Sequence, residues 1–169
     1  WEDWSEIEAK LDVYDRAGVR NVYGAGFADV SPDEAFTKLL GDIQARDPSV
    51  DHAHVDRLTI DTETALSETE RLIEARHGSA DGRQSIWPSP IVLETTSAEG
   101  FQGAYRLAEE YDVMTTAHMS EAEAQEQEVA LSSIEYLRNV GYLGERTLLG
   151  HCVQVDAGDV RGLAATDTK

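Results

Sequence analysis

The chain has 169 residues, with 33 acidic and 14 basic side chains and a formal net charge of -19. This length suits one domain with a substantial hydrophobic core, but it falls short of the about 250 residues of a complete eightfold α/β barrel. The excess of acidic residues argues against a nucleic acid or an anionic membrane as partner, because phosphate groups would be repelled. The acidic residues are spread along the chain, which indicates a solvated anionic surface, either adapted to high salt or simply acidic.

Cys152 is the only cysteine, so no intrachain disulfide can form, which fits a reducing compartment. No apolar run reaches the length of a membrane helix, and the residues after Trp1 do not have the pattern of a signal peptide. We therefore expect a cytoplasmic protein. The first residue is Trp1 and not methionine, which indicates a processed, trimmed or partial chain.

Apolar periodicity and capping residues predict helix, strand, helix and loop over the first part of the chain. A capping box at Ser5 opens the first helix, and Gly18 ends it. Residues 19–27 form a strand. Ser31 and the proline after it open a second helix, and the polar residues 47–64 form a long loop.

The second part of the chain alternates between helices and strands. A capping box at Ser67 opens a helix that ends near Gly78. Residues 85–93 have strand composition, but Pro88 and Pro90 predict either two short pieces or an early end of the strand. The remaining expected elements are a helix over 98–111, a strand over 113–117, a helix over 121–140, a strand over 147–155 and a helix over 158–165.

Continuous apolar strands that alternate with helices are typical of a parallel sheet covered by helices on both faces. We therefore predict an α/β fold with about four parallel strands. In such folds the carboxyl ends of the strands are where the chemistry lies.

Two of the predicted strands lead into a histidine, His118 and His151, and Glu121 follows the first of them by three residues. Because sequential parallel strands are usually neighbours, both imidazoles are expected to point into one pocket at the carboxyl edge of the sheet. A strand-end imidazole can bind a divalent metal, and a carboxylate one turn away can move a proton from the activated water to a leaving amine. The pattern therefore indicates metal-assisted hydrolysis.

Each of these residues also has a plain structural interpretation. His118 can cap a strand, and Glu121 can be an acidic residue in the first turn of a helix, where the helix dipole favours it. His151 can be a buried histidine that is hydrogen-bonded to the backbone. Spacing alone favours these structural roles, whereas the two strand-end histidines taken together favour a site.

The other candidates are assigned no chemistry. His52 and His54 form H-x-H, a two-ligand metal motif when it lies on a strand, but their polar surroundings predict a loop or a helix start. His77 lies in the last turn of a helix, where positive charge is favoured. Cys152 is expected to point away from His151 into the core. Capping accounts for three acidic residues near the ends of elements, Asp29, Asp156 and Asp159.

The stretch AHMSEAEAQEQEVALSSIEYLRNVGYLGERTLLGHCVQVDAGDV resembles the amidohydrolase superfamily. The branch that it resembles holds the triazine hydrolases and the deaminases of cytosine, 8-oxoguanine and S-adenosylhomocysteine. The H-[LM]-[AS]-E motif of that branch matches residues 118–121, and its G-x-L-x-x-[RK]-T-x-L-x-H-C-V motif matches residues 141–153. A weaker similarity extends upstream over AGVRNVYGAGFAD and ALSETERLIEARHGSADGR.

The resemblance implies a distorted (β/α)8 barrel, with the four predicted strands as its third to sixth strands. Residues 1–169 would then be a single partial barrel domain that lacks the first two and the last two strands. The resemblance also implies that His118 is a metal ligand on the fifth strand and that Glu121 is the acid that shuttles protons. His151 would contact the nucleophilic water or polarise the substrate. The implied cofactor is one divalent metal, zinc, with iron as the alternative.

Two family features do not fall on this sequence. The family carries its H-x-H motif on the first strand and an aspartate on the eighth, whereas His52 and His54 follow the third strand and Asp167 lies too close to the sixth. Neither feature is therefore assigned. The loop after the fourth strand begins WPSP where several deaminases carry Pro-His, which argues against nucleoside-type substrates.

We therefore predict that the intact parent is a metal-dependent amidohydrolase. It would deaminate or dechlorinate a small heterocyclic or amide-like substrate at an sp² carbon, and the 169-residue chain alone is expected to be inactive. The alternative is a catalytically silent scaffold, because a catalytic zinc site usually takes three protein ligands. The unpaired edges of an open four-stranded sheet would then favour self-association into a homo-oligomer.

Overall fold

The computed structural model describes residues 4–30, 41, 43–49, 59–120 and 131–169. Its elements, in chain order, are α1 Trp4–Arg16, β1 Asn21–Phe27, α4 Thr62–Arg76, α5 Ser79–Gly82, β2 Gln84–Pro90, the 3-10 helix η1 Leu93–Thr95, α6 Ala98–Glu110, β3 Thr115–Met119, α7 Ser133–Val140, β4 Thr147–His151 and α8 Ala157–Ala165. The predicted α/β class is confirmed. No helix in these ranges is long and apolar enough to cross a membrane.

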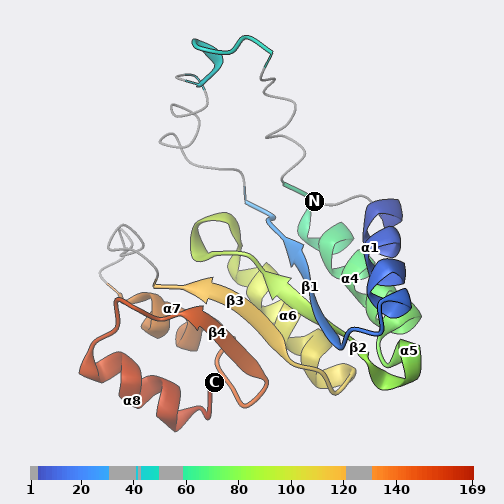
Figure 1. The fold of residues 1–169 in the computed structure, drawn as a ribbon. Helices are drawn as coiled ribbons and strands as arrows, with labels where there is room; N and C mark the ends of the chain where they lie inside the picture. The colour runs from blue at the N-terminus through green and yellow to red at the C-terminus, as the bar shows by residue number, and fades with distance from the viewer. Residues whose placement is uncertain (1–3, 31–40, 42, 50–58, 121–130) are drawn as a thin grey trace.

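The four strands lie in the order β1, β2, β3, β4 and run in the same direction (Figure 1). β1 pairs with β2 and β3 pairs with β4 in parallel registers. The two pairs meet between β2 and β3, where the Thr115 hydroxyl donates to the Pro88 carbonyl at 2.9 Å. The parallel strands that the sequence predicted are therefore present.

Two prolines explain why the sheet divides into two hydrogen-bonded pairs. β2 runs through Pro88 without a break and ends at Pro90, three residues before the end of the predicted strand, so the alternative of an early end is confirmed and that of two short pieces is wrong. The carbonyl of Pro88 faces β3, and alternate residues of a strand face the same neighbour. Since proline has no backbone N–H, β2 cannot donate to β3 at these two positions. The hydroxyl of Thr115 forms one of the bonds that connect the two pairs instead.

The helices pack against one face of the strands. Alternate strand residues are buried on that face, including Phe27 of β1, Ile86 of β2 and Met119 of β3. They meet apolar side chains of α1, α4, α6 and α7 in two clusters. Right-handed crossovers that always add the next strand on the same side place every connecting helix on one face, which accounts for this arrangement.

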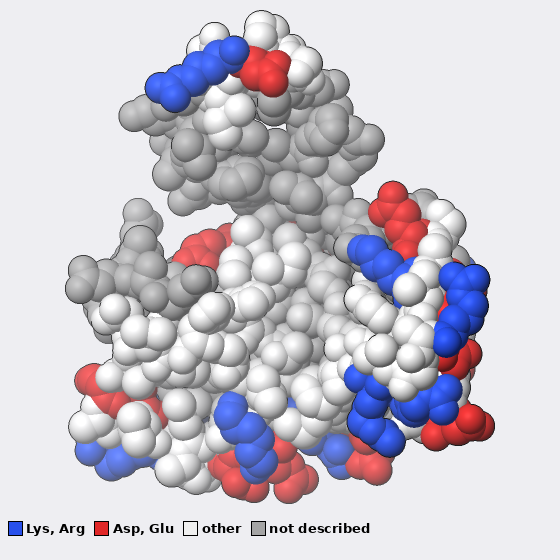
Figure 2. Space-filling model, viewed as in Figure 1, with Lys and Arg blue, Asp and Glu red and all other residues white. Residues whose placement is uncertain are grey.

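The opposite face of the strands is open. Val22 is 51% exposed and Leu148 is 37% exposed on it, and a Cβ atom on Gly24 would contact Ser89 and Thr116 there. Figure 1 looks onto this face with helices behind the strands, and Figure 2 shows charged side chains mainly around its rim. The prediction of helices on both faces is therefore wrong for the residues that the structure describes.

Two of the predicted capping boxes do not cap. α4 begins after Asp61, whose carboxylate accepts the Thr64 amide at 2.9 Å. Ser67 therefore lies inside the helix, where its hydroxyl donates to the carbonyl of Thr64. Ser5 likewise lies inside α1, because the helix already includes Trp4. In α4 an earlier side chain of the same capping chemistry supplies the helix start.

The helix predicted over residues 121–140 is seen only in its second part. α7 begins at Ser133 behind a capping box, in which the Ser132 hydroxyl accepts the Glu135 amide and the Glu135 carboxylate accepts the Ser132 amide. Residues 131 and 132 are not helical. The stretch 121–130 and the predicted helix start at Ser31 lie outside the described residues.

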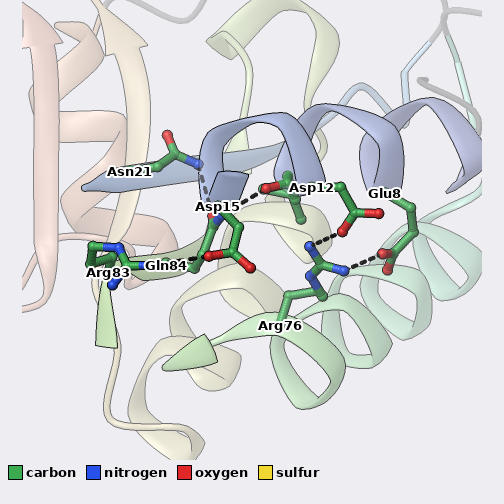
Figure 3. A network of polar contacts seen from close by, with 8 residues as sticks. Glu8, Asp12, Asp15, Asn21, Arg76, Arg83 and Gln84 are labelled. Carbon is green, nitrogen blue, oxygen red and sulfur yellow. Dashed lines mark hydrogen bonds and ion pairs between the residues drawn. The ribbon is translucent and has the colours of Figure 1, made fainter. Parts of the chain in front are cut away.

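Ion pairs and a buried amide attach α1 to the rest of the fold (Figure 3). The Arg76 guanidinium donates to Glu8 at 2.5 Å and to Asp12 at 2.8 Å, and its side chain is only 18% exposed. The fully buried Gln84 donates its side-chain amide to the Leu11 carbonyl at 2.8 Å. Arg76 thus joins the end of α4 to one face of α1.

Replacing Arg76 by methionine is expected to destabilise the protein by about 1–2 kcal/mol, because it leaves the partly buried Glu8 without its partner. Arg71→Met is the matched control, since the Arg71–Glu68 pair lies on one helix and Arg71 is 53% exposed. Urea unfolding measures both variants. Equal losses in the two variants would show that the attachment of α1 does not depend on Arg76.

Thr115→Val is expected to lower the free energy of unfolding by about 2 kcal/mol, because it leaves two buried groups without their hydroxyl partner. Those groups are the Pro88 carbonyl and the Tyr142 hydroxyl, both 2.9 Å from Thr115 Oγ1. Tyr142→Phe is expected to cost less, since Thr115 can still donate to Pro88. A thermal or urea unfolding series that ranks Tyr142→Phe as the more damaging change contradicts this account of the β2–β3 junction.

Candidate functional site

β3 and β4 end side by side, and each carries a histidine near its carboxyl end. In the parallel register His118 is opposite Gly150, and His151 is opposite Met119. His118 Nδ1 lies 2.9 Å from His151 Nε2, and the ring centroids are 5.0 Å apart with an angle of 31° between the planes. One ring nitrogen donates to the other, and both side chains are exposed.

A regular strand would keep these rings apart. Directly paired residues of parallel strands project to the same face, so His151 would follow Met119 into the helix-side core. His118 is the neighbour of Met119 and projects the other way. The backbone of His151 has φ +68°, in the left-handed region, and Cys152 follows with φ +48°. This turn brings the His151 ring to His118 and lets Cys152 pack against the core.

Three consecutive backbone N–H groups hold this turn. Cys152 donates to the Met119 carbonyl at 2.9 Å, and Val153 and Gln154 both donate to the Ser120 carbonyl, at 3.1 and 2.9 Å. Ser120 is buried and also has a positive φ of +50°. A non-glycine residue in this region costs about 1–3 kcal/mol and persists only where its surroundings hold it. The structure therefore fixes the backbone up to the residue that precedes Glu121.

The predicted site residues divide into those that meet and those that lie outside the described residues. His118 and His151 come together as predicted, and the interpretation of His151 as a buried histidine is wrong because its side chain is exposed. Glu121 lies outside the described residues, and so do His52 and His54. Their roles stay predictions.

The residues that were assigned no chemistry behave as structural groups. His77 is the C-cap residue of α4, and its Nδ1 accepts the Ile86 amide at 3.2 Å. Asp156 and Asp159 form the capping box of α8, and hydrogen bonds from backbone amides lower the pKa of Asp156. Burial raises the pKa of the Cys152 thiol, which disfavours the thiolate that a nucleophile would need.

The two imidazoles fit a divalent metal as a pair of ligands. A tetrahedral ion with Zn–N bonds of about 2.0–2.1 Å holds two nitrogens roughly 3.3 Å apart, so a separation of 2.9 Å has to widen only by about 0.4 Å. Within the described ranges no group of three or more His, Cys, Asp or Glu side chains could hold a metal. A complete coordination sphere would need ligands from elsewhere.

Sequence reasoning assigned Asp29 to capping and missed how many partners it gathers. Its carboxylate accepts the Ser97 amide at 2.7 Å, the Ser97 hydroxyl at 2.6 Å and the Thr62 hydroxyl at 2.7 Å. The available signal was an aspartate directly beyond an apolar strand. Its partners lie 33 and 68 residues away, so their proximity could not be inferred from spacing.

Comparison with known proteins gives the chain its relatives, although no family model matches it. It is 29% identical over 153 residues to S-triazine hydrolase of Gordonia rubripertincta, covering 90% of this chain and 31% of the relative. It is 34% identical over 125 residues to 5'-deoxyadenosine deaminase of Methanothermobacter thermautotrophicus, covering 71% of this chain and 29% of the relative. The chain belongs to the amidohydrolase superfamily.

The fold of this amidohydrolase-superfamily chain also occurs in solved proteins. Atrazine chlorohydrolase TrzN from Arthrobacter aurescens TC1, solved in complex with zinc, aligns with 96% of this chain and 33% of its own with a TM-score of 0.72. At 17% sequence identity this likeness shows the fold alone. The chain spans about a third of the length of its curated relatives.

The left-handed backbone at His151 leads to a test of the site geometry. His151→Asn is expected to keep the turn, because asparagine tolerates a positive φ. His151→Val is expected to lower the free energy of unfolding by about 1–3 kcal/mol more than His151→Asn, because a β-branched residue disfavours a positive φ. Urea unfolding of the two variants measures the difference. Equal stabilities would mean that the turn does not depend on the conformation of residue 151.

Proposed function

We propose that the protein that contains this chain is a metal-dependent hydrolase of the amidohydrolase type. It would remove an amine or a halide from an sp² carbon of a small heterocyclic or amide-like substrate. The observation that supports this most directly is the contact between His118 and His151 at the carboxyl edge of two parallel strands. Catalytic groups of α/β folds and barrels gather at this edge.

We also propose that residues 1–169 are one continuous part of a (β/α)8 barrel, with β1 to β4 as its third to sixth strands. Sequential strands with all helices on one face are the arrangement that a barrel requires. The open face, where Val22 and Leu148 are exposed between small residues, would then face the barrel interior. The alignment with a third of a zinc-containing relative supports this assignment.

His118 would hold the metal, and His151 would orient the nucleophilic water or polarise the substrate. Zinc is the metal that the solved relative contains, and iron is the alternative. A divalent ion held there would supply Lewis acidity and would make water a stronger nucleophile at neutral pH. The short distance between the two rings suits these roles, because it places His151 beside a metal that His118 would hold.

Glu121 would carry the proton in this reaction. Water adds to the sp² carbon through its oxygen, and the carboxylate of Glu121 accepts the proton that the water loses. The same group then gives this proton to the leaving amine as the carbon–nitrogen bond breaks, so ammonia departs and the ring carbon keeps a hydroxyl, which becomes a carbonyl when its proton moves to the neighbouring ring nitrogen. For a chloro substrate the bond that breaks is carbon–chlorine, chloride departs as an anion, and Glu121 releases its proton to solvent.

The names of the relatives suggest which substrates to try first. One relative is named for s-triazines and another for 5'-deoxyadenosine. Both compounds are nitrogen heterocycles, and hydrolytic deamination attacks a ring carbon that bears an amine. We therefore propose a small nitrogen heterocycle as the substrate class.

In the full-length protein, Glu121→Gln is expected to lower kcat by roughly 10²–10⁴-fold, because it removes the proton carrier and leaves the metal ligands. His118→Ala is expected to lower the bound metal as well as kcat. Ammonia or chloride release from an amino- or chloro-s-triazine and from 5'-deoxyadenosine measures activity, and elemental analysis measures the metal. Glu110→Gln, an exposed change at the end of α6, is the control.

Full activity in Glu121→Gln would remove this residue from the mechanism. A full-length protein that binds no zinc or iron and hydrolyses none of these substrates would instead favour a catalytically silent scaffold.

A further inference from the structure

Asp29 connects two helix starts to the end of β1. Its carboxylate accepts hydrogen bonds from the Thr62 hydroxyl at the start of α4 and from the amide and hydroxyl of Ser97, the N-cap residue of α6. We call Asp29, Thr62 and Ser97 the Asp29 cluster. A carboxylate is favoured at a helix N-terminus because the helix dipole is positive there. The cluster lies at the carboxyl end of β1, the end of the sheet at which β3 carries His118.

The first turn of α6 leaves room for this carboxylate only because it contains glycine. A Cβ atom added at Gly100 would lie 2.6 Å from Asp29 Oδ2 and 3.1 Å from Thr96 Cγ2. The Gly100 amide donates to the Ser97 hydroxyl at 2.9 Å, which fixes that hydroxyl beside Asp29. Glycine is unfavourable inside a helix, so a close approach accounts for its presence here.

The Asp29 cluster holds the segment between β2 and α6. The backbone amides of Asp29 and Val30 both donate to the Thr95 carbonyl, at 3.0 and 3.1 Å. At the other end of this segment the Ile91 amide donates to the Phe27 carbonyl at 3.1 Å. The end of β1 thus binds residues 91–97 at three points. Backbone hydrogen bonds hold Ile91 and Thr95, and the side chain of Asp29 holds Ser97.

The same segment supports His118. The His118 amide donates to the Ile91 carbonyl at 3.0 Å. Pro90, the preceding residue, has no N–H to offer to β3, so this bond stands where a regular β2–β3 ladder is missing. A shift of residues 91–97 would therefore move the backbone that carries the His118 ring.

We propose that Asp29 is a positioning residue for His118. It fixes residues 91–97, and the Ile91 carbonyl in turn fixes the backbone of His118, so that the ring meets His151. The effect on the histidine pair holds with or without a bound metal. Its consequence for catalysis rests on the proposed function.

Asp29→Asn tests the proposal in the full-length protein without added metal. The exchange of the His118 amide proton is expected to become at least about tenfold faster, and the ring ¹⁵N signals of His118 and His151 are expected to shift, because residues 91–97 are held less firmly when the bonds of the carboxylate to Ser97 and Thr62 are weakened. Asp47→Asn is the matched control. Asp47 accepts the amide and hydroxyl of Ser49 at 3.0 and 2.6 Å, but both residues are exposed and belong to one local turn.

A second set of variants acts on the partners of Asp29. Ser97→Ala removes one hydroxyl from the Asp29 cluster and is expected to give the same changes at His118 in weaker form, whereas Ser97→Thr restores the hydroxyl and is expected to return the signals. Gly100→Ala is expected to resemble Asp29→Asn, since its Cβ takes the space of the carboxylate. If Asp29→Asn does not fold, the comparison of Ser97→Ala with Ser97→Thr decides the question.

Unchanged exchange and unchanged ring signals at His118 in Asp29→Asn and Ser97→Ala would overturn the proposal, whatever happens to activity. Activity separates it from the proposed function. In an active protein, Asp29→Asn is expected to lower kcat at least about tenfold with little change in KM, since the metal ligand and not the substrate contacts is displaced. If the wild-type protein is inactive while His118 responds to Asp29→Asn, the proposed function fails and the positioning role stands.

Discussion

The parallel pairing of β3 with β4, ended by a left-handed turn, is the constraint on which the site depends. In the paired strands the two histidines are not opposite each other: His118 is opposite Gly150, and His151 is opposite Met119. Pairing alone would therefore direct their side chains to opposite faces of the sheet. The positive φ values of His151 and Cys152 reverse the alternation at the end of β4. The His151 imidazole therefore points away from the helix-side core, and Cys152 packs against that core instead. As a result, His118 Nδ1 and His151 Nε2 lie 2.9 Å apart.

Side chains replace backbone hydrogen bonds where the middle of the sheet cannot supply them. Pro88 and Pro90 take two donors from β2. The Thr115 hydroxyl binds the Pro88 carbonyl, and the Ile91 carbonyl binds the His118 amide beyond the end of β2. The carboxylate of Asp29 then fixes the segment that contains Ile91. The position of the His118 backbone therefore depends on the position of β1 through these few hydrogen bonds.

Charged and apolar side chains are separated on the open face of the strands. The chain is strongly acidic, yet the side chains exposed on the open face of the strands include Val22 and Leu148, and charged groups gather mainly at the rim of that view (Figure 2). Membership of the amidohydrolase superfamily and a length of about a third of the relatives agree with this pattern. A metal site at the carboxyl edge, as proposed, would need ligands beyond the two histidines.

The sequence by itself determined the α/β class, four strands near their observed places and the two histidines as candidates, because apolar periodicity and strand-end position are local properties. It misplaced the start of α4, since Asp61 offers a cap of the same chemistry ahead of Ser67. Only the tertiary structure decided that His151 turns toward His118 and that Asp29 reaches Thr62 and Ser97. Both depend on contacts between residues far apart in the chain, and the conformation of a strand end follows from those contacts, which no short window of sequence contains.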